Sequence, residues 1–320
     1  MVRTTVGVLR GGTSSEYEHS LKSGAALMAA LPEDKYDTRD IFIDTHGMWH
    51  RRGMPADPAR ALAQLDVVLN VLHGGVGEDG SVQRMLERAG VPFAGSRASA
   101  AATAHNKRRA RETLQAVGIQ MPQAVSFSIG IDATTAEMAR MVFDTFGPPY
   151  VIKPMAESGG HGIRIATTIL ELPDALGDML EVFGGVIVEE FIRGRESSVE
   201  IIEGFRREDL YALPPTHIEL PDTSRVFDAP ARSQTRIATP GNFAHTEKEA
   251  LMSVARAAHK ALQLSHFSRA DIMLSHHGVP YLLEVNTTPK LHEDAALPQL
   301  LDYVGSSVRE FSEHLVQLAR

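Results

Sequence analysis

One six-residue run constrains the fold more than any other part of the sequence. Residues Val67–Leu72 are apolar except for Asn70. A strand that is apolar on both sides belongs in a parallel sheet covered by helices on both faces. Other β-rich and amphipathic runs alternate in βαβ order at residues 4–9, 21–31, 41–43 and 82–89. The sequence therefore predicts an α/β fold.

Composition narrows the class of protein further. The chain has 320 residues, enough for about two or three domains. It contains no Cys, which excludes disulfides, thiolate catalysis and cysteine metal sites. A net charge of −8 argues against a nucleic-acid binder. No apolar run reaches the ~18 residues of a membrane span and the start lacks a signal-peptide core, so we expect a cytoplasmic protein.

The pattern of elements suggests three domains. We place an N-terminal α/β domain at 1–97, a small central α+β domain at 98–185 and a C-terminal α+β domain at 186–320. Ser15 and Glu18 have capping-box spacing for the first helix. The strand at 186–191 is expected in an antiparallel C-terminal sheet, covered by helices near 245–263 and 305–320. Residues 221–241, rich in Pro, Thr and Ser, predict a long surface loop.

The segment 269–286 has the pattern of a hairpin. With its turn between His277 and Gly278, facing residues have numbers that sum to 555, so Asp271 faces Glu284. Asn286 lies two residues beyond Glu284, on the same face. Such an oxygen cluster suits Mg²⁺, although a solvated strand face is the alternative. His276 and His277 at the turn are expected to face solvent.

Three further features could bind an anion, and each also has an ordinary structural explanation. Lys153 ends an apolar strand before the Gly-rich loop 157–162. Lys107 belongs to a basic helix around 105–118, and Arg269 should share the face of Asp271. The glycine-rich segment His73–Gly80 follows the buried strand, at the position where open α/β sheets bind ligands.

Together these motifs resemble the D-alanine:D-alanine ligases of the ATP-grasp superfamily. They are Gly11-Gly12-Thr13-Ser14-Ser15-Glu16, the segment 73–80, Lys153-Pro154 and the segments 269–271 and 283–287. The resemblance runs from about residue 4 to the C-terminal helix in the family's order. It implies a three-domain ATP-grasp ligase that phosphorylates an amino-acid carboxylate and couples the acyl phosphate to an amine.

The resemblance also implies roles for individual residues. The ATP contacts would be Lys107, Lys153 and Arg232 for the phosphates, Glu189 for adenine and Glu196 for ribose. Two Mg²⁺ ions, with Mn²⁺ as the alternative, would bind Asp271, Glu284 and Asn286. Glu16 would bind the ammonium of the first substrate near His73, and Arg269 would steady the carboxylate and the tetrahedral intermediate.

Departures from the family pattern gather around the amino-acid substrates. Gly159 and Gly160 replace two Ser, Ser233 replaces a lid Tyr, and Arg232 replaces a Lys. Around the substrates His19 replaces a small apolar residue, Lys290 a Gly and Ala295 a Ser. The added cation at Lys290 would favour an acceptor with an extra carboxylate, unless its side chain turns into solvent.

The substrates are therefore left open. Small amino-acid-like molecules are expected, and a homodimer is open. One alternative is a ligase for another D-amino acid, another amine or a cyclising reaction. Another is a non-catalytic nucleotide-binding protein that kept the fold. A Rossmann dehydrogenase is disfavoured because the segment 7–12 lacks the G-x-G-x-x-G spacing.

Overall fold

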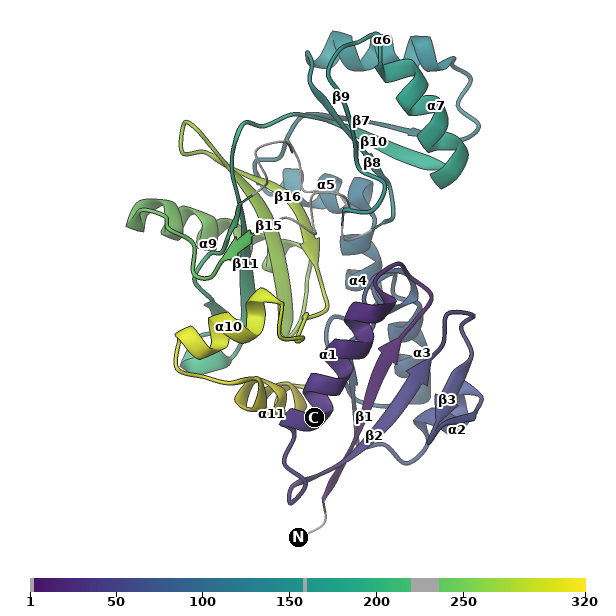
Figure 1. Ribbon diagram of the computed structural model, residues 1–320, viewed down its shortest axis with the longest axis vertical. Helices are drawn as coiled ribbons and strands as arrows, with labels where there is room; N and C mark the ends of the chain where they lie inside the picture. The colour runs from purple at the N-terminus through teal and green to yellow at the C-terminus, as the bar shows by residue number, and fades with distance from the viewer. Residues whose placement is uncertain (1–2, 158–159, 220–235) are drawn as a thin grey trace.

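Three sheets organise the computed structural model, which describes residues 3–157, 160–219 and 236–320 (Figure 1). The sheet of the central third lies at the top of that view, the C-terminal sheet in the middle and the N-terminal sheet at the lower right. The α/β class expected from the sequence is confirmed. Gly159, Arg232 and Ser233 lie outside the described residues. Within these residues, no helix combines the length and apolar character needed to cross a membrane.

The N-terminal sheet has the strand order β4-β3-β2-β1-β5-β6. Its strands are β1 (Thr4–Gly11), β2 (Tyr36–Ile43), β3 (Trp49–Arg51), β4 (Met54–Pro55), β5 (Val67–Asn70) and β6 (Phe93–Ala94). β1 pairs in parallel with β2 and β5, and β5 pairs in parallel with β6. The apolar run that begins at Val67 is therefore the buried parallel strand that its composition predicts.

Helices cover both faces of this sheet. They are α1 (Tyr17–Ala30), α2 (Pro58–Leu62), the 3₁₀ turn η1 (Gly75–Gly77) and α3 (Ser81–Ala89). Val68 packs with α2 and α3, whereas Val67 packs with α1 and with Phe311 from the end of the chain. The predicted capping box is absent, because α1 begins at Tyr17 with Glu16 as its N-cap residue and no side-chain cap.

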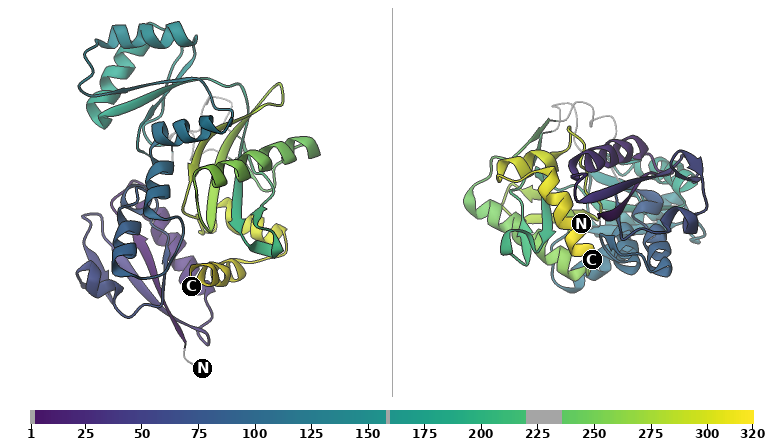
Figure 2. Two further views of the ribbon diagram at one scale, coloured as in Figure 1. Left: turned by 180° about the vertical axis from the view of Figure 1, so that it is seen from behind. Right: turned by 90° about the horizontal axis from the view of Figure 1, so that it is seen from below.

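The last two helices are α10 (Ala296–Tyr303) and α11 (Val308–Ala319). The segment 305–320 was expected to cover the C-terminal sheet. In the structure α11 lies between two sheets, because Phe311 and Leu315 share one core with Val67 of the N-terminal sheet and with Phe267 of the C-terminal sheet. The ring centroids of Phe267 and Phe311 lie 6.0 Å apart. In both views of Figure 2, α11 also lies against the N-terminal part of the chain. The chain therefore closes back on its first domain.

The central sheet is antiparallel, with the order β7-β10-β8-β9. Its elements are β7 (Ala124–Ser128), α6 (Thr135–Thr145), β8 (Tyr150–Pro154), β9 (Arg164–Ala166), α7 (Leu172–Phe183) and β10 (Gly185–Glu190). The strand at 186–191 thus belongs mainly here, between β7 and β8, and not in the C-terminal sheet as expected. Its run Val186–Val188 is apolar on both faces, which suits the centre of either sheet, so local pattern could not assign it.

The C-terminal sheet has the order β14-β13-β11-β15-β16, with β12 paired to β11. Its elements are β11 (Gly194–Glu203), the 3₁₀ turn η2 (Phe205–Arg207), β12 (Leu210–Ala212), β13 (His217–Glu219), β14 (Arg236–Ala238), α9 (His245–Ala261), β15 (Phe267–Ser275) and β16 (Pro280–Asn286). Part of the predicted loop 221–241 is therefore strand β14. The rest of that loop up to residue 235 lies outside the described residues.

Two helices join the first domain to the rest, α4 (Ala98–His105) and α5 (Lys107–Ala116). The predicted basic helix begins at Lys107, where Asn106 caps it by accepting from the Arg109 N–H at 3.1 Å. Both helices bury their alanines against the C-terminal sheet together with α9. Helices α4 and α5 thus lie beside β16. Lys107, at the start of α5, reaches Glu284 near the end of that strand.

The predicted hairpin is β15 and β16. Asp271 pairs with Glu284 and Arg269 with Asn286, both at the sum of 555. A bulge between Asp271 and Ile272 shifts the pairs nearer the turn by one residue. His276 and His277 are exposed at the turn, as expected. The sequence therefore predicted correctly which residues of the two strands pair at the polar face of the hairpin.

Candidate active site

A cavity of about 570 Å³ opens between the central and C-terminal sheets. Its walls come from β8, β10, β11, β15 and β16, and its far end is closed by the segment 290–299 and by His19 of α1. The predicted site residues that line it are Lys153, Glu189, Glu196, Arg269, Asp271, Glu284, His19 and Lys290. Residues from the central sheet, the C-terminal sheet and helix α1 thus meet at one cavity.

The polar face of the hairpin forms the cavity's middle. The Asn286 amide nitrogen lies 3.1 Å from Asp271 Oδ2 and 3.5 Å from Glu284 Oε1. Arg269 donates twice to the Asp271 carboxylate, at 3.0 and 2.9 Å. Lys107 Nζ lies 3.8 Å from Glu284 Oε2. Two carboxylates and an amide therefore converge, as the hairpin register predicts, with cations on both sides.

These two carboxyl groups differ in pKa. Burial raises the pKa of Asp271, and Glu284 adds to this while Arg269 opposes it. Burial alone would also raise the pKa of Glu284, but Lys107 and Lys153 lower it below its usual value. The cations thus keep at least Glu284 charged in a buried place.

The donor set fits a magnesium ion. Within the described ranges no group of three His, Asp or Glu side chains converges as a metal site. Mg²⁺ does not need one, because it is commonly held by one or two carboxylates while water and substrate phosphates complete its shell. The Asn286 amide nitrogen contacts both the Asp271 and the Glu284 carboxylates, and with a cation bound between these groups the amide can flip so that its oxygen faces the ion.

At the other wall, Glu189 of β10 is the centre of a buried ion-pair cluster. Its two carboxylate oxygens lie 2.5 Å from Arg111 and 2.7 Å from Lys153. Burial alone would raise the pKa of Glu189, but these two cations lower it below its usual value. The sequence predicts that Lys153 contacts the ATP phosphates and that Glu189 contacts adenine. In the structure the two side chains form an ion pair, so Glu189 holds Lys153 in place.

Strand β11 contributes a row of polar side chains to the cavity floor. Glu196, Ser198 and Glu200 alternate along the strand and all line the cavity. Burial raises the pKa of Glu196 to about 7 and that of Glu200 to about 8. Glu196 and Glu200 therefore lie at opposite ends of the part of β11 that lines the cavity.

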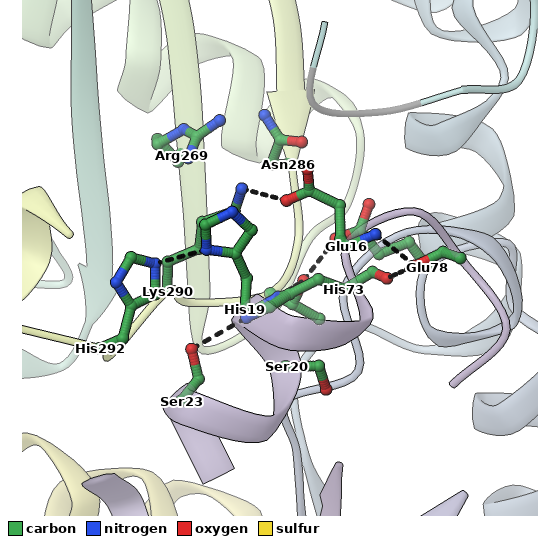
Figure 3. A network of polar contacts seen from close by, with 12 residues as sticks. Glu16, His19, Ser20, Ser23, His73, Glu78, Arg269, Asn286, Lys290 and His292 are labelled. Atoms are coloured by element: carbon green, nitrogen blue, oxygen red, sulfur yellow. Dashed lines mark hydrogen bonds and ion pairs between the residues drawn. The ribbon is translucent and has the colours of Figure 1, made fainter. Parts of the chain in front are cut away.

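The end of the cavity near the first domain is shown in Figure 3. Lys290 donates to Glu16 and lines the cavity, so its side chain does not turn into solvent. The preference for an acceptor with an extra carboxylate stays a prediction. Beside this pair, His19 Nδ1 lies 3.0 Å from His292 Nε2. Burial and the charges of His19 and Lys290 lower the pKa of His292 to about 4. The Lys290 ammonium thus neutralises the negative charge that the Glu16 carboxylate would otherwise bring to this end of the cavity.

His73 lies behind that pair, away from the cavity lining. Its ring nitrogens lie 3.0 Å from Ser23 Oγ and 3.3 Å from Thr288 Oγ1. The Thr288 hydroxyl also donates to Glu78. Burial, with the nearby Lys290 charge, places the pKa of His73 well below its usual value. His73 is therefore a neutral ring that ties α1 to the segment after β16.

Sequence reasoning missed Arg111, Glu78, Glu200 and His292. Arg111 was counted only as part of a basic helix, although a cation one turn after Lys107 points to the same side. Glu200 alternates with Glu196 on one strand, and that spacing was the available signal. His292 has no local signal, because its partner His19 is 273 residues away.

Comparison with known proteins shows to which family the chain is similar. The family model described as D-ala D-ala ligase C-terminus matches residues 113–317, and the one described as D-ala D-ala ligase N-terminus matches residues 52–96. D-alanine–D-alanine ligase of Anaeromyxobacter sp. strain Fw109-5 is 32% identical over 97% of this chain and 95% of its own. The Geobacter sulfurreducens ligase of the same name is 34% identical over 93% of this chain and 88% of its own.

Solved structures share the overall fold of the chain. The VanG D-Ala:D-Ser ligase from Enterococcus faecalis superposes with a TM-score of 0.87 at 26% identity, covering 100% of both chains. D-alanine–D-alanine ligase from Bacillus anthracis complexed with ATP superposes with a TM-score of 0.80 at 26% identity, covering 99% of this chain and 97% of its own.

Proposed function

The chain belongs to the D-alanine:D-alanine ligase family, and we propose that its cavity binds ATP and Mg²⁺ to join an amino-acid carboxylate to an amine. Members of this family are ATP-dependent ligases that form a C–N bond. The reaction would phosphorylate the carboxylate, release ADP, and expel phosphate when the amine attacks the acyl phosphate.

The observation that carries this proposal is the convergence of opposite charges on one cavity. Asp271 and Glu284 supply buried carboxylates for a metal, and Lys107 and Lys153 bring cations to the same point. Phosphoryl transfer needs mainly positioning and neutralisation of oxyanions, and a bound Mg²⁺ would supply the latter as a Lewis acid. A solvated strand face would not need cations from two other elements.

The residues divide along the cavity into two ends. Glu189 and Glu196 lie toward the central sheet, where the nucleotide base and ribose would bind. Lys153 is fixed by Glu189 and would hold a phosphate without reorganisation. Arg269 lies at the other side of Asp271, where its charge would steady the carboxylate and the tetrahedral intermediate.

The substrate end supports a ligase whose substrates differ from two D-alanines. Lys290 neutralises Glu16, the residue expected to anchor a substrate ammonium. Family membership does not fix the amine either, since one structural neighbour is named a D-Ala:D-Ser ligase. The homodimer and the cytoplasmic location expected from the sequence stay predictions.

The test is a panel of D- and L-amino acids and simple amines, singly and in pairs, with ADP release and product mass as readouts. We expect ADP release that requires Mg²⁺ and a particular pair, and its loss in Glu284→Gln. If no pair releases ADP although ATP binds, the chain is the non-catalytic nucleotide-binding protein of the alternative.

A further inference from the structure

Lys290 occupies the place where the cavity meets Glu16. Its ammonium donates to the Glu16 carboxylate, and only 20% of the Lys290 side chain and 4% of the Glu16 side chain are exposed (Figure 3). Lys290 lines the cavity, whereas Glu16 is not part of the lining. A ligand that comes from the cavity to the Glu16 carboxylate therefore meets the Lys290 ammonium first.

The backbone on both sides of Lys290 is anchored, so the side chain can move while its root stays in place. Leu291 is buried, and its N–H donates to Ser23 Oγ at 3.1 Å. On the other side, the buried Thr288 donates its hydroxyl to Glu78. The lysine stem is long and flexible, and its rotation alone can carry the ammonium to a new partner.

The neighbouring carboxyl groups on β15 and β11 do not replace Glu16 as a partner for a displaced Lys290. The Asp271 carboxylate already accepts two hydrogen bonds from Arg269. Burial raises the pKa of Glu200 to about 8, so this group carries little negative charge at neutral pH. A buried ammonium without an anion is costly, so Lys290 would need an anion from another source.

The two carboxylates of the segment 290–299 are a weaker substitute. Glu293 and Asp294 line the same end of the cavity but are exposed. An exposed ion pair adds little stability, because water already solvates both charges. The anion that best replaces Glu16 as the partner of Lys290 is therefore one that the ligand itself brings into the cavity.

We propose that Lys290 determines the specificity for the acid that is phosphorylated, by exchanging partners when this substrate binds. The substrate ammonium takes the place of Lys290 at Glu16, and the Lys290 ammonium moves to the substrate carboxylate. One ion pair becomes two, and every buried charge keeps a partner. The inference rests on the proposed function, in which the cavity binds an amino-acid carboxylate, and it adds a specificity-determining residue to that site.

The exchange makes each half of the amino acid a poor ligand by itself. An amine without a carboxylate would pair with Glu16 but leave the displaced Lys290 ammonium without an anion. An acid without an amine would draw Lys290 away and leave the Glu16 carboxylate without its cation. The ion pair thus selects against a ligand that carries only one of the two charges.

The test compares each amino acid of the panel with its amino alcohol and with the acid that lacks its amine, such as D-alanine with D-alaninol and propionate. Affinity is measured by calorimetry in the presence of Mg²⁺ and ADP, so that no γ-phosphate offers Lys290 another anion. The variants are Lys290→Met and Glu16→Gln, which each remove one charge and keep the length of the side chain. Lys22→Met is the matched control, because Lys22 is an exposed lysine on α1.

We expect Lys290→Met to bind the amino alcohol about 10- to 100-fold more tightly than wild type does, because no ammonium then competes for Glu16. Affinity for the amino acid should change by less than about fivefold, since the lost contact to its carboxylate offsets the lost competition. Glu16→Gln should show the mirror image, with a gain of about tenfold for the amine-free acid. Lys22→Met should match wild type with all three kinds of probe.

Three results would overturn the inference: an amino alcohol that binds wild type as tightly as its amino acid does, no gain for the amino alcohol in Lys290→Met, or equal changes for all three kinds of probe, which a purely structural role would produce. Failure of every amino acid to bind wild type would also overturn it. Failure of the proposed function is a separate outcome, in which the probes respond to Lys290→Met as expected but no pair releases ADP.

Discussion

Glu189→Gln tests whether the buried ion-pair cluster is needed to hold the central sheet against α5. The substitution keeps the shape of the side chain but leaves Arg111 and Lys153 without a buried anion. Breaking a buried pair from one side costs about 3–5 kcal/mol. The amide oxygen can still accept from one cation, so we take that value once and not for both pairs. The free energy of unfolding should therefore fall by about 3–5 kcal/mol.

The assay is urea unfolding followed by circular dichroism, with the free energy extrapolated to zero denaturant. The matched control is Glu190→Gln, because Glu190 also lines the cavity but forms no ion pair among the described residues. The control should lose less than about 1 kcal/mol, the value of an exposed charge. If Glu189→Gln loses no more than its control, the two cations are solvated well enough in the native state and the ion-pair argument is wrong.

Three further perturbations probe other parts of the molecule. Glu284→Gln should lower Mg²⁺-dependent ADP release by more than about 100-fold in a variant that still unfolds cooperatively, since the amide removes the charge that holds the metal. Near-normal turnover would contradict the metal site. Phe311→Ala should cost about 3–5 kcal/mol in urea unfolding, because this α11 side chain is fully buried in the core that the N-terminal and C-terminal sheets share. A loss below about 1 kcal/mol, as for a surface residue, would contradict that packing. The pKa of His292 is about 4 when folded against 6.5 in its ordinary state, so the unfolded chain binds more protons between these values and stability should fall as pH drops from 6.5 to 4. His292→Gln should flatten that slope, and an unchanged slope would assign it to other groups.

Much of the fold and the metal face follows from short-range pattern. The run Val67–Leu72 fixed a strand buried on both faces, because side chains alternate and neither side is polar. The hairpin register paired Asp271 with Glu284, since a tight turn sets which residues face each other. Family resemblance extended this to an ATP-grasp ligase, which the comparisons bear out.

Long-range packing decided what local pattern left open. The strand at 186–191 has the same apolar pattern whichever sheet it joins, and only its neighbours β7 and β8 place it in the central one. The helix at 308–319 is amphipathic, but its pattern does not say which sheet it will cover. Periodicity reports which side of an element is buried and carries no information about the partner.

The substrate end depends most on tertiary structure. Lys290 and Glu16 are 274 residues apart, and only the return of the chain to its first domain brings the ammonium to that carboxylate. The same closure sets His19 against His292. The sequence by itself determined which charged groups the chain carries and the strand faces of those around the metal. Tertiary structure alone decided which charges neutralise each other and which remain for a ligand, because charge pairing depends on distance in space and not on separation along the chain.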